Sequence, residues 1–296
     1  MANSKEIRTR LVSVASTRQI TSAMKMVSAA KLKKAQDAVL QLRPYAQKLQ
    51  EILGSLSNSD NEGSSEFTRE REIEKVLVII VTSNRGLCGA FNVNVIKQAF
   101  QMVQEKYSNQ LSNKKVSFIA IGKKGADFLK RRNLPIYDLN TNLFDKVNFE
   151  NVSTYASGIM ADYVEGKFDR VELVYNQFKN AAVQILRSEQ YLPVAKAVEV
   201  KKVGSGTSTN IDFIFEPSKS QIIKELIPKS LKIQLFKAVL DSVASEHGAR
   251  MTAMHKATDN ATDLLKELRL QYNKARQAAI TNEILEIVAG AEALKG

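Results

Sequence analysis

The sequence predicts an α/β fold: a long antiparallel coiled coil of the N- and C-terminal helices, with a compact α/β domain between them. Three observations predict it. Apolar and small residues recur every three or four positions from Ile7 to Leu56, and again from Leu231 to Ala275. Between these segments the period changes to short apolar runs that alternate with helical stretches. With 296 residues the chain can hold both parts.

The first predicted element is an N-terminal coiled-coil helix over residues 1–56. It contains no glycine before Gly54, and Pro44 is its one expected kink. At 1.5 Å per residue it is roughly 80 Å long, too long for an ordinary globular helix. The segment from Met1 to Lys34 is rich in basic and hydroxyl residues, as transit peptides are. We interpret it as mature protein, because the helical pattern continues past residue 50 without a break.

The second predicted element is the α/β domain, over residues 73–195. A polar break from Gly54 to Glu72 precedes it. Strands are expected at Val76–Thr82, Val116–Ile121, Val171–Tyr175 and Val183–Leu186, with helices near Asn92–Tyr107, Lys123–Arg132 and Phe149–Glu165. This alternation is typical of a parallel core sheet. Residues 196–227, with the run "KKVGSGTSTN", are expected to form a linker and a further segment of this domain.

The third predicted element is a C-terminal coiled-coil helix over residues 228–296, with Pro228 in its first turn. If Leu56 lies beside Pro228 in an antiparallel pair, helical geometry brings Ser4 beside Ile280. The residues from Thr281 onward then have no partner within the chain. They are apolar on nearly every side, so another protein is expected to enclose them.

Catalytic and cofactor motifs are weak. The stretch "SNRGLCGAFN" follows a predicted strand, but it lacks both G-x-G-x-x-G and a lysine-hydroxyl pair, so its glycines are interpreted as turn residues. Cys88 is the only cysteine, and the two histidines, His247 and His255, are eight positions apart on one helix. These spacings suit neither a metal site nor a nucleophile with its base. No catalytic residue, cofactor or metal is expected.

Basic charge is concentrated in the first helix. The chain carries a net charge of +12, and residues 1–56 hold ten lysines and arginines against three acidic residues. The cluster Lys31, Lys33 and Lys34 has three interpretations: a solvated helix face, contact with an acidic protein loop, or a basic coiled-coil arm that binds nucleic acid. The nucleic-acid interpretation lacks interleaved aromatic residues and any known motif.

A polar group precedes the apolar end. Arg276, Gln277 and Thr281 lie within two helical turns in "NKARQAAITNE". In a plain coiled coil they would be surface residues. At the mouth of an enclosing protein, they could hydrogen-bond carboxylates, with the arginine making bidentate contacts.

Four stretches together resemble one family, the γ subunit of F-type ATP synthases of the bacterial type. They are "IRTRLVSVASTRQITSAMKMVSAAKLKKAQ", "SNRGLCGAFN", "SEHGARMTAMHKATDNA" and "YNKARQAAITNEILEIVAGAEAL". The resemblance implies a non-catalytic central rotor shaft with a Rossmann-like middle domain. It further implies that rotation couples proton or sodium flow through the membrane c-ring to ATP synthesis in a ring of three α and three β subunits.

The resemblance also assigns residues to partners. Arg276, Gln277 and Thr281 would form a catch on a β subunit, Met24 and Arg250 a lower β contact, and the apolar end a bearing whose tip includes Ile284, Ile287, Val288 and Ala291. Phe213, Phe215 and Glu216, from "FIFEP", would touch the c-ring and the ε subunit. No nucleic acid is implied as partner. The expected location is the cytoplasmic face of the bacterial inner membrane, as a peripheral protein attached only through the complex.

Overall fold

The computed structural model describes residues 4–57, 66–69, 71–145, 147–194 and 219–294. Its contacts divide the chain into two compact units. Unit 1 joins residues 1–29 to residues 250–296, and unit 2 comprises residues 30–249. Two long helices, α1 (Ser4–Ser57) and α7 (Lys219–Ala293), each contribute residues to both units. The expected boundaries at residues 56 and 228 therefore differ from this division, since the basal part of each helix packs with the sheet domain.

Unit 2 is built on a five-stranded sheet. Its strands are β1 (Val76–Val81), β2 (Val116–Ile121), β3 (Ile136–Asn140), β4 (Arg170–Phe178) and β5 (Gln184–Leu192), in the order β3-β2-β1-β4-β5. The first four strands are parallel, and β5 runs antiparallel to β4. Every residue of β1 is buried, as expected for the middle of a sheet covered on both faces. The predicted α/β fold class is confirmed.

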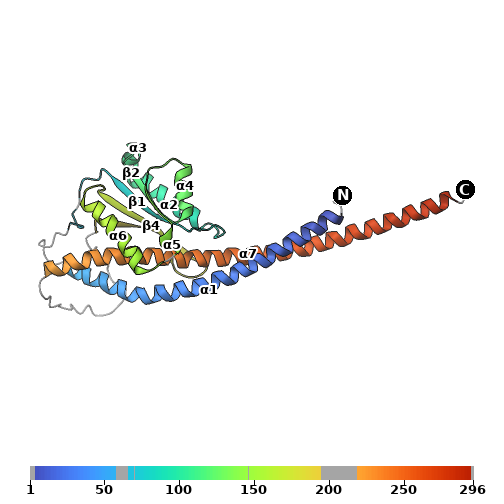
Figure 1. The fold of residues 1–296 in the computed structure, drawn as a ribbon, viewed down its shortest axis with the longest axis horizontal. Coiled ribbons are helices and arrows are strands. Elements are labelled where there is room, and N and C mark those ends of the chain that lie inside the picture. The colour runs from blue at the N-terminus through green and yellow to red at the C-terminus, as the bar shows by residue number, and fades with distance from the viewer. Residues whose placement is uncertain (1–3, 58–65, 70, 146, 195–218, 295–296) are drawn as a thin grey trace. The chain divides into compact units, whose positions relative to one another are not determined.

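Helices cover both faces of the sheet (Figure 1). On one face α2 (Phe91–Lys106) and α4 (Lys123–Arg131) bury apolar side chains against the sheet. On the other face lie α6 (Phe149–Val164) and the basal part of α7. Two short helices, α3 (Ser108–Ser112) and α5 (Asn142–Asp145), complete the unit.

Strand β3 was absent from the sequence prediction, and β5 is longer than predicted. The sequence of β3, IYDLN, holds two polar residues and follows Pro135, and none of its five side chains is fully buried. An edge strand has one neighbour and one open side, so it needs no continuous apolar run. For β5 the sequence predicted only the apolar beginning of the strand. In the structure, β5 stays paired with β4 as far as Leu192.

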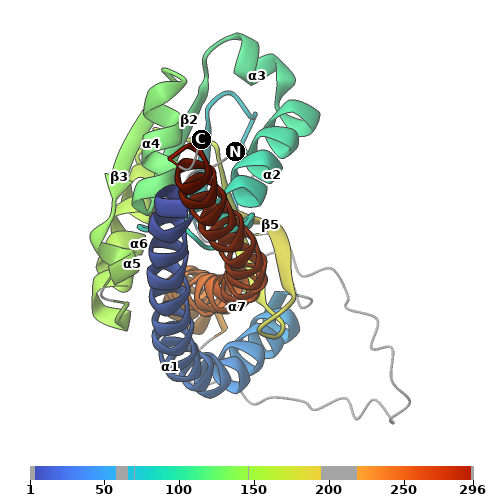
Figure 2. The same ribbon diagram turned by 90° about the vertical axis from the view of Figure 1, so that its right-hand side faces the viewer.

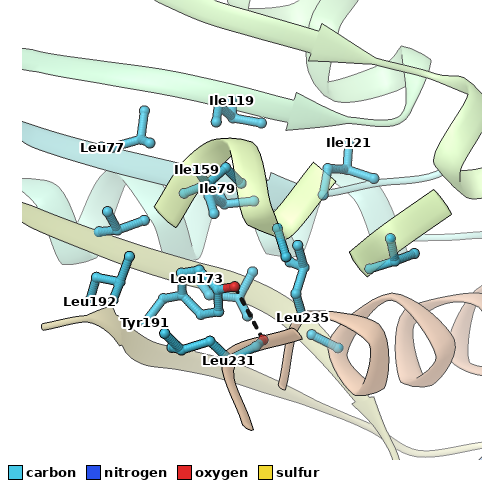
Figure 3. Close-up of a cluster of buried hydrophobic side chains, with 14 of the residues drawn as sticks. Leu77, Ile79, Ile119, Ile121, Ile159, Leu173, Tyr191, Leu192, Leu231 and Leu235 are labelled. Carbon is cyan, nitrogen blue, oxygen red and sulfur yellow. Dashed lines mark hydrogen bonds between the residues drawn. The ribbon is translucent and has the colours of Figure 1, made fainter. Parts of the chain in front are cut away.

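Helix α7 begins at Lys219, nine positions before the predicted start at Pro228, which lies inside the helix. Proline in a helix interior removes one hydrogen bond, so a start at Pro228 was the favoured interpretation. The extra turns persist because Ile223 and Ile227 pack into the same core as Leu231. In Figure 3 the Tyr191 hydroxyl, which is fully buried, donates to the Leu231 carbonyl oxygen at 3.1 Å and fixes this part of α7 against β5.

The basal part of α7 also buries a carboxyl group. The Asp241 side chain is inaccessible to solvent, and neither of its oxygens accepts a hydrogen bond from the described residues. Burial raises its pKa from 3.8 to about 6, against the opposing charges of Arg43 on α1 and Lys237 on α7, while the Glu189 carboxylate on β5 adds to the rise. The folded protein therefore holds a proton on Asp241 in a pH range where the unfolded chain has lost it.

We expect Asp241→Asn to remove part of the pH dependence of stability. Because the folded pKa lies above the unfolded one, the wild type gains stability as pH falls from about 6 to about 4, on the order of 3 kcal/mol from this group. The variant cannot take up that proton. Urea denaturation of the full chain, followed by tyrosine fluorescence, measures the free energy of unfolding at pH 8 and pH 4.5. Relative to the wild type, the variant should be more stable at pH 8 than at pH 4.5. An equal difference at both pH values would contradict the assignment.

Candidate interaction surface

Unit 1 is a coiled coil with a heptad pattern. On α7 the buried or half-buried positions are spaced alternately by four and three residues: Met254, Thr258, Ala261, Leu265, Leu268, Tyr272 and Ala275. On α1 steps of four and three residues link Ile7, Leu11 and Val14, and Thr21 and Ser28 follow at whole heptads of seven residues. This is the repeat of a left-handed coiled coil. The two helices lie side by side in both ribbon views (Figures 1 and 2).

The seam is narrow and partly polar. The Thr258 hydroxyl donates to the Thr21 hydroxyl at 2.9 Å, and Ser28 is buried on the same face. Ile20 and Val27 are the apolar neighbours of Thr21 and Ser28, each one position earlier in the sequence. They are exposed by 60% and 57%, because the buried positions of the heptad fall on the smaller hydroxyl residues. Unit 1 therefore carries apolar side chains outward on α1, which a strict heptad reading of the sequence would have found.

The pairing of the two helices ends before α7 does. Extending the register set by Thr21 and Thr258 along antiparallel helices places Ser4 level with Ala275. Helix α7 continues to Ala293, and in Figure 1 it runs past the beginning of α1. Every described residue from Arg276 to Leu294 is exposed. The segment without a partner among the described residues therefore starts five positions earlier than the sequence predicted.

We call residues 276–294 the tip helix. Its large apolar side chains are exposed all round, by between 47% and 90%: Ile280, Ile284, Leu285, Ile287, Val288 and Leu294. Ala291 is exposed as well, and Gly290 has no atom within 4 Å of where a Cβ would stand. An apolar surface of this extent on a single helix marks an interaction site.

The predicted polar group begins the tip helix. Arg276, Gln277 and Thr281 are all exposed, and the Thr281 hydroxyl donates to the Gln277 carbonyl oxygen at 2.9 Å. Gln277 and Thr281, four positions apart, share one helix face. The three side chains are thus available together at the base of an apolar helix.

The other predicted contact residues are placed differently. In unit 1 Met24 is half-buried, and Arg250 is only 7% exposed, so Arg250 offers little surface. Phe213, Phe215 and Glu216 lie outside the described residues.

The stretch "SNRGLCGAFN" forms a closed turn between β1 and α2. The backbone amides at the start of α4 are bonded to the end of β1 and to the first residues of this stretch: Lys123 to Asn84 Oδ1 at 2.8 Å, Lys124 to the Ser83 carbonyl at 3.0 Å and Gly125 to Thr82 Oγ1 at 2.9 Å. The Asn92 side chain in turn accepts from the Ser83 amide at 2.9 Å. These hydrogen bonds hold the stretch against the start of α4.

A groove lies beside β3 and α6, and two of the carboxylates that line it, Asp138 and Asp162, accept hydrogen bonds from neighbouring side chains. The Tyr155 hydroxyl donates to the Asp138 carboxylate at 2.7 Å, and the Lys167 ammonium donates to the Asp162 carboxylate at 2.7 Å. Burial, with the hydrogen bond to Asp138, raises the pKa of Tyr155, so its hydroxyl stays protonated. Among the described residues, no three His, Cys, Asp or Glu side chains gather as they would around a metal ion. Within the same residues, no helix has the length and apolar character to cross a membrane.

The chain matches the sequence profile of one family, described as ATP synthase, over residues 3–294. Two full-length relatives are the ATP synthase gamma chains of Flavobacterium psychrophilum, 59% identical, and Flavobacterium johnsoniae, 56% identical; each comparison covers 100% of both chains.

Solved structures share the fold. A chain of the Tetrahymena thermophila mitochondrial ATP synthase central stalk and c-ring is 26% identical, with a TM-score of 0.57 over 80% of this chain and 99% of that one. A chain from the rotor of the Euglena gracilis mitochondrial ATP synthase is 23% identical, with a TM-score of 0.64 over 94% of this chain and 98% of that one.

We expect Gly122→Ala to destabilise unit 2 by about 2–4 kcal/mol, since φ is +105° at this position and a Cβ would overlap the Thr82 carbonyl oxygen. The matched control is Gly158→Ala in α6, where a Cβ meets nothing within 4 Å, and a gain of about 0.5–1 kcal/mol is expected. Urea denaturation of the full chain measures both. Equal effects of the two variants would argue against the close approach of Thr82 to Gly122.

Proposed function

This chain belongs to the ATP synthase gamma chain family, and from that membership we propose that it is the rotor subunit of the enzyme's central stalk. One observation supports the proposal beyond the family name: the tip helix exposes its apolar side chains all round, and no described residue of unit 1 covers them. Such a helix is an aggregation hazard unless a partner surrounds it. A ring of three α and three β subunits, closed around the tip helix, supplies that partner.

The tip helix divides into two functional parts. Ile284, Ile287, Val288 and Ala291 form the bearing. Their contact with the ring is apolar and non-directional, so it does not hold one rotational angle. Arg276, Gln277 and Thr281 form the catch, since they offer directional hydrogen bonds to a carboxylate-bearing loop of a β subunit.

Further contacts complete the rotor. Met24 and Arg250 make a lower contact with a β subunit, in which Arg250 acts from a largely buried position. Phe213, Phe215 and Glu216 contact the c-ring and the ε subunit. The protein is then a peripheral subunit on the cytoplasmic face of the bacterial inner membrane, held there through the complex.

The protein has no catalysis of its own in this proposal. The amides at the start of α4 donate to Asn84 and Thr82. Beside β3, the Tyr155 hydroxyl donates to the Asp138 carboxylate. Nucleotide binding and hydrolysis belong to the α/β ring. Rotation of this chain couples flow of protons or sodium ions through the c-ring to ATP synthesis.

Reconstitution tests the proposal. An α/β ring assembled with the full chain should co-purify with it and hydrolyse ATP faster than the ring alone, and a bead attached to the chain should rotate. A ring that neither retains the chain nor changes its ATPase rate would overturn the proposal.

The catch can be tested by substitution. Arg276→Ala and Gln277→Ala should each weaken retention of the chain by the ring about tenfold, as loss of a charge-assisted hydrogen bond does. The control is Lys266→Ala, at an exposed position of the same helix where the ammonium bonds only locally, to Asp263 at 3.0 Å. Co-purification and ATPase rate measure the effect, and equal losses in all three variants would contradict the catch.

The bearing should tolerate change better than the catch. Val288→Ala removes a side chain that is 51% exposed and keeps the surface apolar. We expect its rotation rate to stay within about twofold of wild type, because an apolar contact loses only area. Rotation assays on Val288→Ala and Arg276→Ala, side by side, make the comparison; a larger loss in Val288→Ala would reverse the assignment.

A further inference from the structure

The hairpin between β4 and β5 contacts both long helices within unit 2. Its tip is rigid, because the Asn180 side-chain oxygen accepts from the amides of Ala182 and Val183 at 3.0 and 2.7 Å. The two strands pair from Val171 with Leu192 to Phe178 with Gln184, so the tip is continuous with the sheet. A force on this tip is therefore borne by the whole sheet.

The hairpin lies against α7 along one side. The Ser245 hydroxyl donates to the Asn176 carbonyl oxygen at 3.2 Å, and Ser245 is fully buried. One helical turn on, a Cβ at Gly248 would stand 3.0 Å from the Ala181 carbonyl oxygen and 3.2 Å from its Cα. Only a glycine lets the hairpin backbone approach the helix this closely without displacement.

The same hairpin holds α1 through one side chain. Arg43 Nη2 donates to the Phe178 carbonyl oxygen at 2.7 Å and lies 3.9 Å from Asp241 Oδ1 on α7. The Arg43 guanidinium on α1 thus interacts with two elements at once. It bonds to the sheet at Phe178 and lies near α7 at Asp241. Because the Asp241 carboxyl is fully buried and Arg43 is only partly exposed, this contact is shielded better than a surface ion pair.

We propose that Arg43 is the positioning residue that fixes α1 against α7 and the β4–β5 hairpin, so that both helices rotate together with the sheet domain. Apolar packing resists separation of helices but resists sliding or rotation of one along another much less. A charged, directional bond does resist it, since a small displacement breaks its geometry. This inference rests on the proposed rotor function and assigns a part of it to one residue.

The test is Arg43→Ala in the complete membrane-embedded complex, with Arg43→Lys as the conservative variant. The control is Lys48→Ala on the same helix, whose ammonium is exposed and bonds only to Glu51, at 3.1 Å. ATP hydrolysis and ATP-driven ion pumping are measured together. We expect Arg43→Ala to keep hydrolysis within twofold of wild type while ions pumped per ATP fall at least twofold, Arg43→Lys to fall between, and Lys48→Ala to match wild type.

Two further results separate the possible failures. Hydrogen exchange on the full chain should show α1 around residue 43 and the hairpin tip opening at least tenfold faster in Arg43→Ala, with β1 unchanged, which confirms that the variant folds. Unchanged exchange, or pumping per ATP equal to wild type, would overturn the inference while leaving the rotor function intact. A wild-type complex that hydrolyses ATP without pumping would instead count against the proposed function itself.

Discussion

Unit 2 depends on the burial of the basal part of α7 against the sheet. Ile227, Leu231 and Leu235 enter the same core as β1 and β4, and the bond from Tyr191 to the Leu231 carbonyl fixes their register. Because this anchorage begins before Pro228, the helix keeps its proline in an interior turn. It also carries Asp241 into a buried position, where the carboxyl meets Arg43 from α1. A helix held so firmly at its base can leave its other end without internal support.

Unit 1 is organised in the opposite way. Its seam includes Thr21, Ser28 and Thr258, which gain less from burial than leucine or isoleucine would. The larger apolar residues Ile20 and Val27 are exposed instead. A coiled coil that keeps apolar area on its outside, and ends in an unpaired apolar helix, is built to be completed by other proteins.

Particular residues show how far sequence reasoning extends. The apolar run Val76–Val81 and the helical repeats on either side predicted the α/β class, because period and length are local properties. Strand β3 escaped prediction because Tyr137 and Asp138 are exposed at a sheet edge and interrupt the apolar run. The candidate surface at Arg276 to Ala291 was predicted from composition and length together. The structure leaves its polar and apolar residues exposed, and their roles toward a partner stay a prediction. The start of the unpaired segment was misplaced by five positions, since the register came from an assumed pairing of helix ends.

The sequence by itself determined that the chain ends in an apolar helix with no matching length of helix opposite it, because helical rise per residue is fixed. It also indicated the family, through three motifs on the two long helices and one between β1 and α2. Only the tertiary structure decided that Thr21 contacts Thr258 and that amides of α4 donate to the end of β1. It also decided that Arg43 contacts Asp241 and the β4–β5 hairpin. These contacts join residues far apart in the chain, and their geometry follows from packing that no local pattern encodes.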